Sequence, residues 1–177
     1  MNAKSHDTPA PVAARGAAAL PVEAAEHRPA PYHGADIAEG DHNAFAALVE
    51  RLPADRAGAI DAIRNGFPAS MLKDASVYFD VPANRIRAVL RLPETTAATM
   101  IKRGANLDAG VSERIWRLAD LVHMAREVFE DRAAATYWLR TPNRSFLDAA
   151  PMDYLDTEPG AMSVRQVLNA IATGAAA

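Results

Sequence analysis

Prolines divide the middle of the chain, between about residues 67 and 104, into short segments. The segments read "PASMLKDASVYFD", "PANRIRAVLRL" and "PETTAATMIKRG", and each begins with proline. Proline suits the first turn of a helix, whose N–H groups have no partner within the helix, but it disrupts a helix interior. The spacing therefore predicts three short helices in close succession.

Composition points to helices throughout. Alanine and leucine lead, aromatic residues make up 6% of the 177 residues, and no run alternates valine, isoleucine and threonine as a strand would. We expect an all-α fold, a short-helix bundle with a helix-turn-helix, a long central helix and a C-terminal helical domain.

The long central helix is predicted at about residues 111–130, with Ser112 as a candidate N-cap. Apolar residues recur there with three-four spacing: Ile115, Leu118, Val122, Ala125 and Phe129. Trp116 and Leu121 lie off this stripe, so a second apolar face is expected. Another part of the chain or a second copy could cover that face, and a homodimer is one way to do so.

Three regions are expected along the chain. Residues 1–42 mix alanine, proline and isolated charges without a helical or strand period, which predicts a disordered arm. Residues 43–110 are expected to form a helical N-terminal domain, and residues 111–177 a second helical domain.

Charge and cysteine content exclude several classes of protein. The chain contains no cysteine, which removes disulfide scaffolds, thiolate zinc sites and cysteine nucleophiles and fits a cytoplasmic location. No apolar run is long enough to span a membrane. The net charge of −3 gives no global attraction to nucleic acid, so such binding needs a local patch.

Residues 81–104 have the layout of a helix-turn-helix. Ile86, Val89 and Leu90 are expected to face inward, and Leu92 and Pro93 to form the turn. The second helix carries residue types that contact phosphates or base edges. The candidate DNA-binding residues are Thr95, Thr96, Thr99, Lys102 and Arg103.

The same piece is basic within an acidic chain. Its cations, which only Glu94 opposes within the piece, are Arg85, Arg87, Arg91, Lys102 and Arg103. The alternative interpretation is a short amphipathic helix with arginines on its wet side, which is common in helical proteins. The second helix has little polar surface for reading bases, which favours weak or dimer-dependent DNA binding.

No catalytic or metal-binding residue is predicted. His123 and Glu127 lie one helical turn apart, but no second segment completes a metal site, so a solvated helix face is the better interpretation. The serines lack the context of a nucleophile, and no glycine-rich phosphate loop is present. We expect no enzyme activity and no cofactor.

The end of the chain, "WLRTPNRSFLDAAPMDYLDTEPGAMSVRQVLNAIATG", combines several motifs. They are a tryptophan-leucine pair, a proline-asparagine turn, a short proline-opened helix ending in leucine, a threonine-acid step, a glycine and an amphipathic helix. This order resembles the C-terminal toxin-binding domain of the Xre/MbcA/ParS antitoxin family. The matching positions are Trp138, Leu139, Pro142, Asn143, Pro151, Leu155, Thr157, Glu158, Gly160 and the helix through Val164, Val167, Leu168 and Ile171.

The family also carries an upstream Xre-like helix-turn-helix, so the resemblance covers roughly residues 67–177. It implies a type II antitoxin that binds its cognate toxin and, as a homodimer, represses its own promoter on operator DNA. The usual partner is a RES-domain toxin that consumes NAD, and the two form a hetero-oligomer. Typical members have a glycine-rich step after the proline-asparagine turn, where this chain has "RSFLDAA".

The last helix is the expected toxin-blocking element. Thr157 or Asp156 can cap it, Glu158 favours its positive end, and Pro159 suits its first turn. We hypothesise that the helix and the tail after it occlude the active site of the toxin. The candidate contact residues are Arg165, Gln166, Asn169, Thr173 and Gly174.

Three alternatives remain at this point. The residues around Arg165 could be no more than a solvated helix face. The chain could be a stand-alone dimeric helix-turn-helix transcriptional regulator, or a helical adaptor that does not bind DNA.

Overall fold

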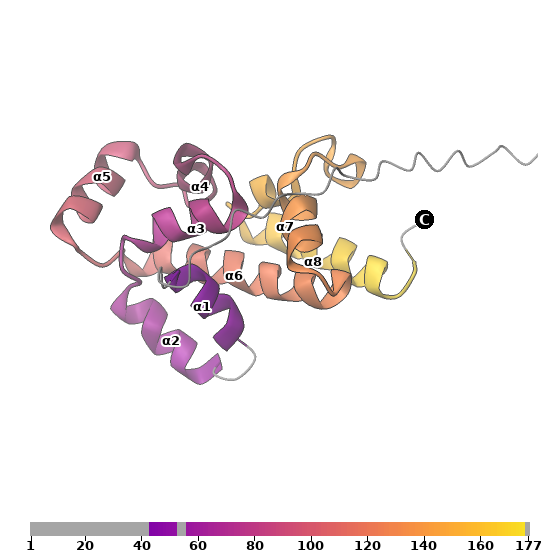
Figure 1. The fold of residues 1–177 in the computed structure, drawn as a ribbon, viewed down its shortest axis with the longest axis horizontal. Helices are drawn as coiled ribbons and strands as arrows, with labels where there is room; N and C mark the ends of the chain where they lie inside the picture. The colour runs from indigo at the N-terminus through magenta and orange to yellow at the C-terminus, as the bar shows by residue number, and fades with distance from the viewer. Residues whose placement is uncertain (1–42, 53–55, 176–177) are drawn as a thin grey trace, which may run out of the picture. The chain divides into compact units, whose positions relative to one another are not determined.

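The longest helix, α6 (Ala109–Phe129), forms the centre of the fold. α1 (Ala44–Arg51) and α2 (Arg56–Asn65) pack against it, as do α7 (Arg132–Arg140) and α8 (Glu158–Ala172), as Figure 1 shows. The structure is a computed structural model that describes residues 43–52 and 56–175. The predicted arm, residues 1–42, lies outside the described residues.

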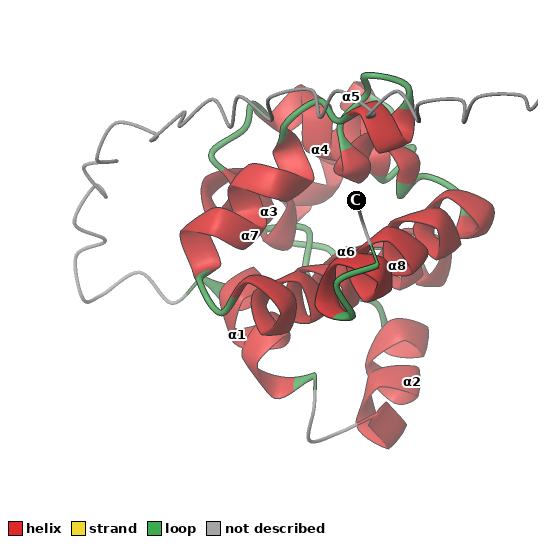
Figure 2. Cartoon of the chain, turned by 90° about the vertical axis from the view of Figure 1, so that its right-hand side faces the viewer, coloured by secondary structure: helices red, strands yellow, loops and turns green. Residues whose placement is uncertain are grey.

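The all-α prediction is confirmed for the described part of the chain, in which Figure 2 shows helices and loops only. The three predicted short helices are α3 (Met71–Phe79), α4 (Ala83–Val89) and α5 (Glu94–Arg103). Pro82 and Pro93 stand just ahead of α4 and α5 rather than within their first turns, with extended backbone at ψ 147° and 145°. The prolines therefore end the preceding loops as well as starting the helices.

Contrary to the prediction, Ser112 is not the N-cap of α6. The cap is Asp108, whose carboxylate accepts a hydrogen bond from the Val111 N–H at 2.9 Å. Ser112 is buried, and its Oγ accepts the Phe67 N–H at 2.9 Å. The hydroxyl thus satisfies a backbone group from the loop before α3, a long-range role that helix-start signals do not reveal.

Both apolar faces of α6 are covered within the chain. The expected stripe is fully buried except for Phe129, which is partly buried, and Leu121 on the second face is fully buried. Since α1, α2, α7 and α8 all pack against α6, other parts of the chain cover most of the second face, although Trp116 on it is only partly buried. Homodimer formation itself stays a prediction.

Two 3-10 turns, η1 (Arg144–Phe146) and η2 (Pro151–Tyr154), connect α7 to α8. A row of aromatic rings fixes this connection: Phe129, Trp138, Phe146 and Tyr154 follow one another with centroid distances of 5.7, 6.1 and 5.2 Å. Such pairs stabilise beyond the area that they bury.

The described residues belong to one compact unit, Glu39–Ala177. The predicted border between residues 110 and 111 falls in the first turn of α6, and the division into two domains stays a prediction. Within residues 43–52 and 56–175, no helix combines the length and apolar character that crossing a bilayer needs.

Candidate functional site

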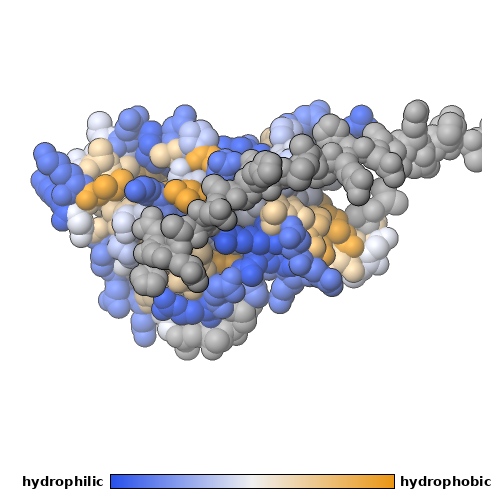
Figure 3. Space-filling model, in the orientation of Figure 1, coloured by the Kyte–Doolittle hydropathy of each residue, from blue (hydrophilic) through white to orange (hydrophobic). Residues whose placement is uncertain are grey.

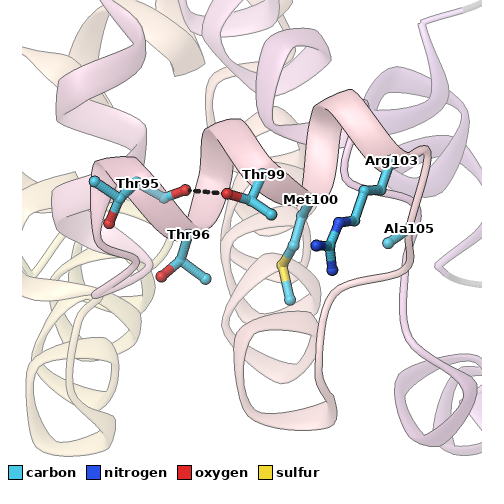
Figure 4. A pocket seen from close by; sticks show the side chains of 6 residues that line it. All are labelled: Thr95, Thr96, Thr99, Met100, Arg103 and Ala105. Atoms are coloured by element: carbon cyan, nitrogen blue, oxygen red, sulfur yellow. Dashed lines mark hydrogen bonds between the residues drawn. The ribbon is translucent and has the colours of Figure 1, made fainter.

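α5 presents the candidate DNA-binding residues on its surface. Thr95, Thr96, Thr99, Lys102 and Arg103 are all exposed. Four of them, without Lys102, line a shallow open hollow together with Met100 and Ala105 (Figure 4). In Figure 3 the end of the molecule that carries α5 is hydrophilic at its outer edge, with a hydrophobic patch beside it.

The attachment of α5 explains this exposure. Ala97 is the buried residue of the helix, and Met100 is partly buried. The Thr99 hydroxyl donates to the Thr95 carbonyl oxygen at 2.8 Å, a bond that an outside acceptor could replace. A helix held by one narrow face leaves the opposite face free for a ligand.

Three of the four arginines of the predicted basic piece are paired with carboxylates. Arg85 makes a two-point contact with Asp153, with N–O distances of 3.0 and 3.0 Å, and Arg91 contacts Asp156 at 2.8 Å. Glu94 is the only acid within the piece, but acids from outside it oppose its charge as well. Asp153 and Asp156 lie more than sixty residues away in sequence and meet α4 only through the fold.

Arg87 contacts Glu94 itself, at 3.2 Å. Within the part of the chain that the structure describes, Lys102 and Arg103 have no carboxylate partner. Within the predicted basic piece, the positive charge without a carboxylate partner is thus concentrated at the C-terminal end of α5.

Arg140 joins α7 to the end of α3. Its Nη1 donates to the Phe79 carbonyl oxygen at 2.9 Å and lies 2.9 Å from Asp80 Oδ2, while Arg85 donates to the Arg140 carbonyl oxygen at 3.1 Å. Asp80 has a left-handed backbone with φ 51° and exposes the carbonyls that Arg140 binds. The helix-turn-helix region and the C-terminal motif are therefore in direct contact.

The start of α8 is fixed locally, as expected. Thr157 is the N-cap, and its Oγ1 accepts the Gly160 N–H at 3.2 Å. Gly160 is fully buried against the backbone of η2, where a side chain would overlap the Tyr154 carbonyl oxygen. The motif glycine is needed because η2 and α8 touch backbone to backbone.

Arg117, on α6, holds the same end of α8. The sequence did not predict this role. The Arg117 side chain is buried, contacts Glu113 at 2.7 Å and lies 3.1 Å from a Glu158 carboxylate oxygen. The Arg117 Nε–Glu158 contact lacks hydrogen-bond geometry, so it is an ionic contact. A buried arginine between two acids holds the first turn of α8 over α6.

α8 presents one continuous exposed stripe. Gln166, Asn169 and Thr173 are exposed and follow one another at helical spacing, and Met162, 52% exposed, extends the stripe by one turn. Sequence reasoning missed Met162, although its position four residues before Gln166 was a usable signal. Gly174, with φ 70°, ends the helix.

Arg165 points elsewhere. It contacts Asp120 of α6 at 2.6 Å and lies 3.7 Å from Glu158. The structure thus separates it from Gln166 and Asn169, with which the sequence had grouped it, and gives it a role in holding α8 to α6.

The remaining motif residues lie in α7, in the loop that follows it, and in and just after η2. Trp138 is partly buried between Phe129 and Phe146, Pro142 is exposed, and Pro151 and Leu155 are buried. Asn143 accepts the Ser145 N–H through its side chain at 2.9 Å.

The candidate metal pair is internal to one helix. His123 and Glu127 lie 3.4 Å apart on α6 and form an (i,i+4) pair. No cluster of three or more possible metal ligands occurs among residues 43–52 and 56–175.

Tyr78, on α3, is a buried phenol. Burial raises its pKa above the usual 10.0, although nearby Arg132 and Arg126 lower the pKa.

Comparison with known proteins covers both halves of this arrangement. Residues 124–174 match the model of the antitoxin Xre/MbcA/ParS C-terminal toxin-binding domain, and residues 58–120 match the antitoxin Xre-like helix-turn-helix domain. An antitoxin Xre of Pseudomonas putida is 31% identical over 115 residues, which cover 63% of this chain and 69% of that protein. An antitoxin Xre of Yersinia enterocolitica is 25% identical over 125 residues, 70% of this chain and 84% of its own length. With both domains matched in order around one α6 helix, the chain belongs to the Xre/MbcA/ParS antitoxin family.

Proposed function

We propose that the chain is the antitoxin of a type II toxin–antitoxin pair and neutralises a cognate toxin by direct binding. The match of residues 124–174 to a toxin-binding domain carries this proposal. In this function the chain catalyses no reaction and needs no cofactor, and it acts in the cytoplasm.

The contact surface is the exposed stripe of α8 and the tail beyond it. Thr157, Gly160 and Arg117 hold the first turn of α8, so its second half projects in a defined direction. Gln166, Asn169 and Thr173 then face outward together. Figure 3 shows a hydrophobic area at the end of the molecule where α7 and α8 lie, which suits a protein partner.

A double variant, Gln166→Ala with Asn169→Ala, tests this surface. We expect it to weaken binding of the product of the neighbouring open reading frame and to leave the melting temperature unchanged. Asp61→Ala with Arg64→Ala is the matched control, because those side chains are also three residues apart and are 77% and 74% exposed on α2. Equal binding by both double variants would place the toxin contact elsewhere, and deletion of residues 161–177 without loss of neutralisation would exclude α8 altogether.

The toxin is proposed to be a RES-domain protein that consumes NAD, on the resemblance of the C-terminal motifs. α8 would then occlude the entrance to its active site. Expression of the toxin alone should deplete cellular NAD and arrest growth, and co-expression of this chain should restore both. Growth arrest without a fall in NAD would keep the antitoxin function and reject this toxin class.

We further propose that α5 binds operator DNA and that a homodimer pairs two such helices. Thr95, Thr96 and Thr99 can contact phosphates or base edges, and Lys102 and Arg103 can neutralise phosphates. Dimer formation would place two copies on a two-fold operator.

One observation favours the alternative of an adaptor without DNA binding. Arg85, Arg87 and Arg91 are all paired with carboxylates, which leaves α5 with little supporting charge. A gel shift with the DNA upstream of the gene separates the two functions. Salt-sensitive retention would support the repressor, and no retention at low salt would support the adaptor.

A further inference from the structure

Leu147 is exposed to an extent unusual for its type. It is 88% exposed, more than any other large hydrophobic residue in the described part of the chain. Its backbone is left-handed with φ 55°, and the next residue, Asp148, is left-handed with φ 63°. Residues other than glycine disfavour this conformation because their Cβ atom approaches the following carbonyl oxygen.

The loop that carries Leu147 is fixed by its neighbours. The Asn143 N–H donates to the Ala149 carbonyl oxygen at 3.0 Å, and the Asp148 N–H donates to the Asn143 carbonyl oxygen at 3.1 Å. Phe146 is 1% exposed, and its ring packs against Trp138 and Tyr154. The loop therefore holds Leu147 outward in one position.

The same turn, η2, secures both this loop and the start of α8. The Tyr154 hydroxyl donates to the Phe146 carbonyl oxygen at 2.9 Å, and the Tyr154 carbonyl oxygen lies against Gly160. Leu147 thus lies on an element that is continuous with the proposed toxin-binding helix. It also lies inside the region, residues 124–174, that matches a toxin-binding domain.

We propose that Leu147 is an apolar anchor that inserts into a socket on the toxin. The inference rests on the proposed function and adds a second contact point to α8. The partner must offer a pocket that accepts a branched aliphatic side chain, with polar groups at its rim to meet the exposed Arg144, Ser145 and Asp148. An apolar centre within a polar rim is the usual arrangement of a binding hot spot.

The backbone strain makes a clean test possible. Leu147→Gly removes the side chain and also suits the left-handed backbone, so we expect an equal or higher melting temperature together with weaker toxin binding. Leu147→Met keeps an apolar side chain and should lose much less affinity than Leu147→Gly. Val77→Ala is the control, because Val77 is 57% exposed on α3, outside residues 124–174.

The measurement is the dissociation constant of the full-length chain with the purified product of the neighbouring open reading frame. Full burial of a leucine corresponds to a factor of roughly 10 to 100, so Leu147→Gly should weaken binding at least tenfold. Unchanged binding by Leu147→Gly would overturn the inference and leave the proposed function intact. A lower melting temperature with weaker binding would assign Leu147 a structural role and overturn it too.

A second copy of the chain is the competing occupant of this loop. Sedimentation of the wild type and of Leu147→Gly without toxin distinguishes the two. The same oligomeric state for both chains supports the toxin as partner, and loss of self-association in the variant would overturn the proposal. If the wild-type chain itself fails to bind the neighbouring product, the proposed function fails and this inference fails with it.

Discussion

Gly160→Ala should destabilise the chain strongly, although alanine is the better helix former. The added Cβ would overlap the Tyr154 carbonyl oxygen, with the Tyr154 carbonyl carbon at 2.9 Å and Thr157 Oγ1 at 3.0 Å. A backbone carbonyl cannot rotate away as a flexible side chain can. The first turn of α8 must therefore move off η2.

The size of the effect follows from two losses. Overpacking a close contact costs about 1–3 kcal/mol. Moving the turn also weakens the Thr157 cap, whose hydrogen bond to the Gly160 N–H is 3.2 Å long, and loss of such a cap costs about 1 kcal/mol. We expect the free energy of unfolding to fall by about 3 kcal/mol and the melting temperature by about 10 °C.

Urea unfolding followed by circular dichroism measures this change. Gly110→Ala is the matched control, because Gly110 is also in the first turns of a helix and its added Cβ would meet only the Asp108 carboxylate, at 3.2 Å. Since the Asp108 side chain can shift by a few tenths of an ångström, that control should change the free energy of unfolding much less than Gly160→Ala does. If Gly160→Ala and Gly110→Ala unfold alike, the close approach of η2 and α8 is not what makes Gly160 necessary.

Three further predictions follow from particular side chains. Ser112→Ala leaves the buried Phe67 N–H without its 2.9 Å acceptor and should lower the free energy of unfolding by about 1–3 kcal/mol in urea. Because burial raises the pKa of Tyr78, the unfolded chain loses that proton first, so stability should fall as pH rises above 10.0, and Tyr78→Phe should remove this part of the fall in melting temperature. Lys102→Ala with Arg103→Ala should weaken operator retention in a gel shift and spare toxin neutralisation; equal loss of both would contradict two separate surfaces.

The sequence predicted best those features that depend on neighbours along the chain. Thr157 caps α8, and Ile86 and Val89 face the core, because caps and apolar spacing act over a few residues. The order of motifs from Trp138 onward identified the family for the same reason.

Features that depend on distant partners were not predictable in this way. Arg117 looks like any surface arginine of a long helix, yet it is 8% exposed because α8 folds over it. Ser112 has the sequence position of a cap, but in the fold its hydroxyl binds the N–H of Phe67, which lies 45 residues away in sequence. Leu147 is not part of a periodic apolar pattern. Its exposure could not be predicted, because the sequence does not show that Phe146 rather than Leu147 is buried.

The pairing of the arginines with carboxylates also lowers the expected salt dependence of DNA binding. Each phosphate that a protein cation neutralises contributes about −0.9 to the slope of log affinity against log salt. With Arg85 and Arg91 bound to Asp153 and Asp156, one copy offers Lys102 and Arg103, which corresponds to a slope of about −2.

Two copies on one operator would give a slope of about −4, and titration of gel-shift retention against salt concentration measures it. A slope near −2 would contradict a dimer on the operator. A slope well beyond −4 would mean that the arginines leave their carboxylates to reach phosphate, and Asp153→Asn should then strengthen DNA binding. If the slope is near −4, Arg85 makes no contact with a phosphate. Asp153→Asn should then leave DNA binding unchanged.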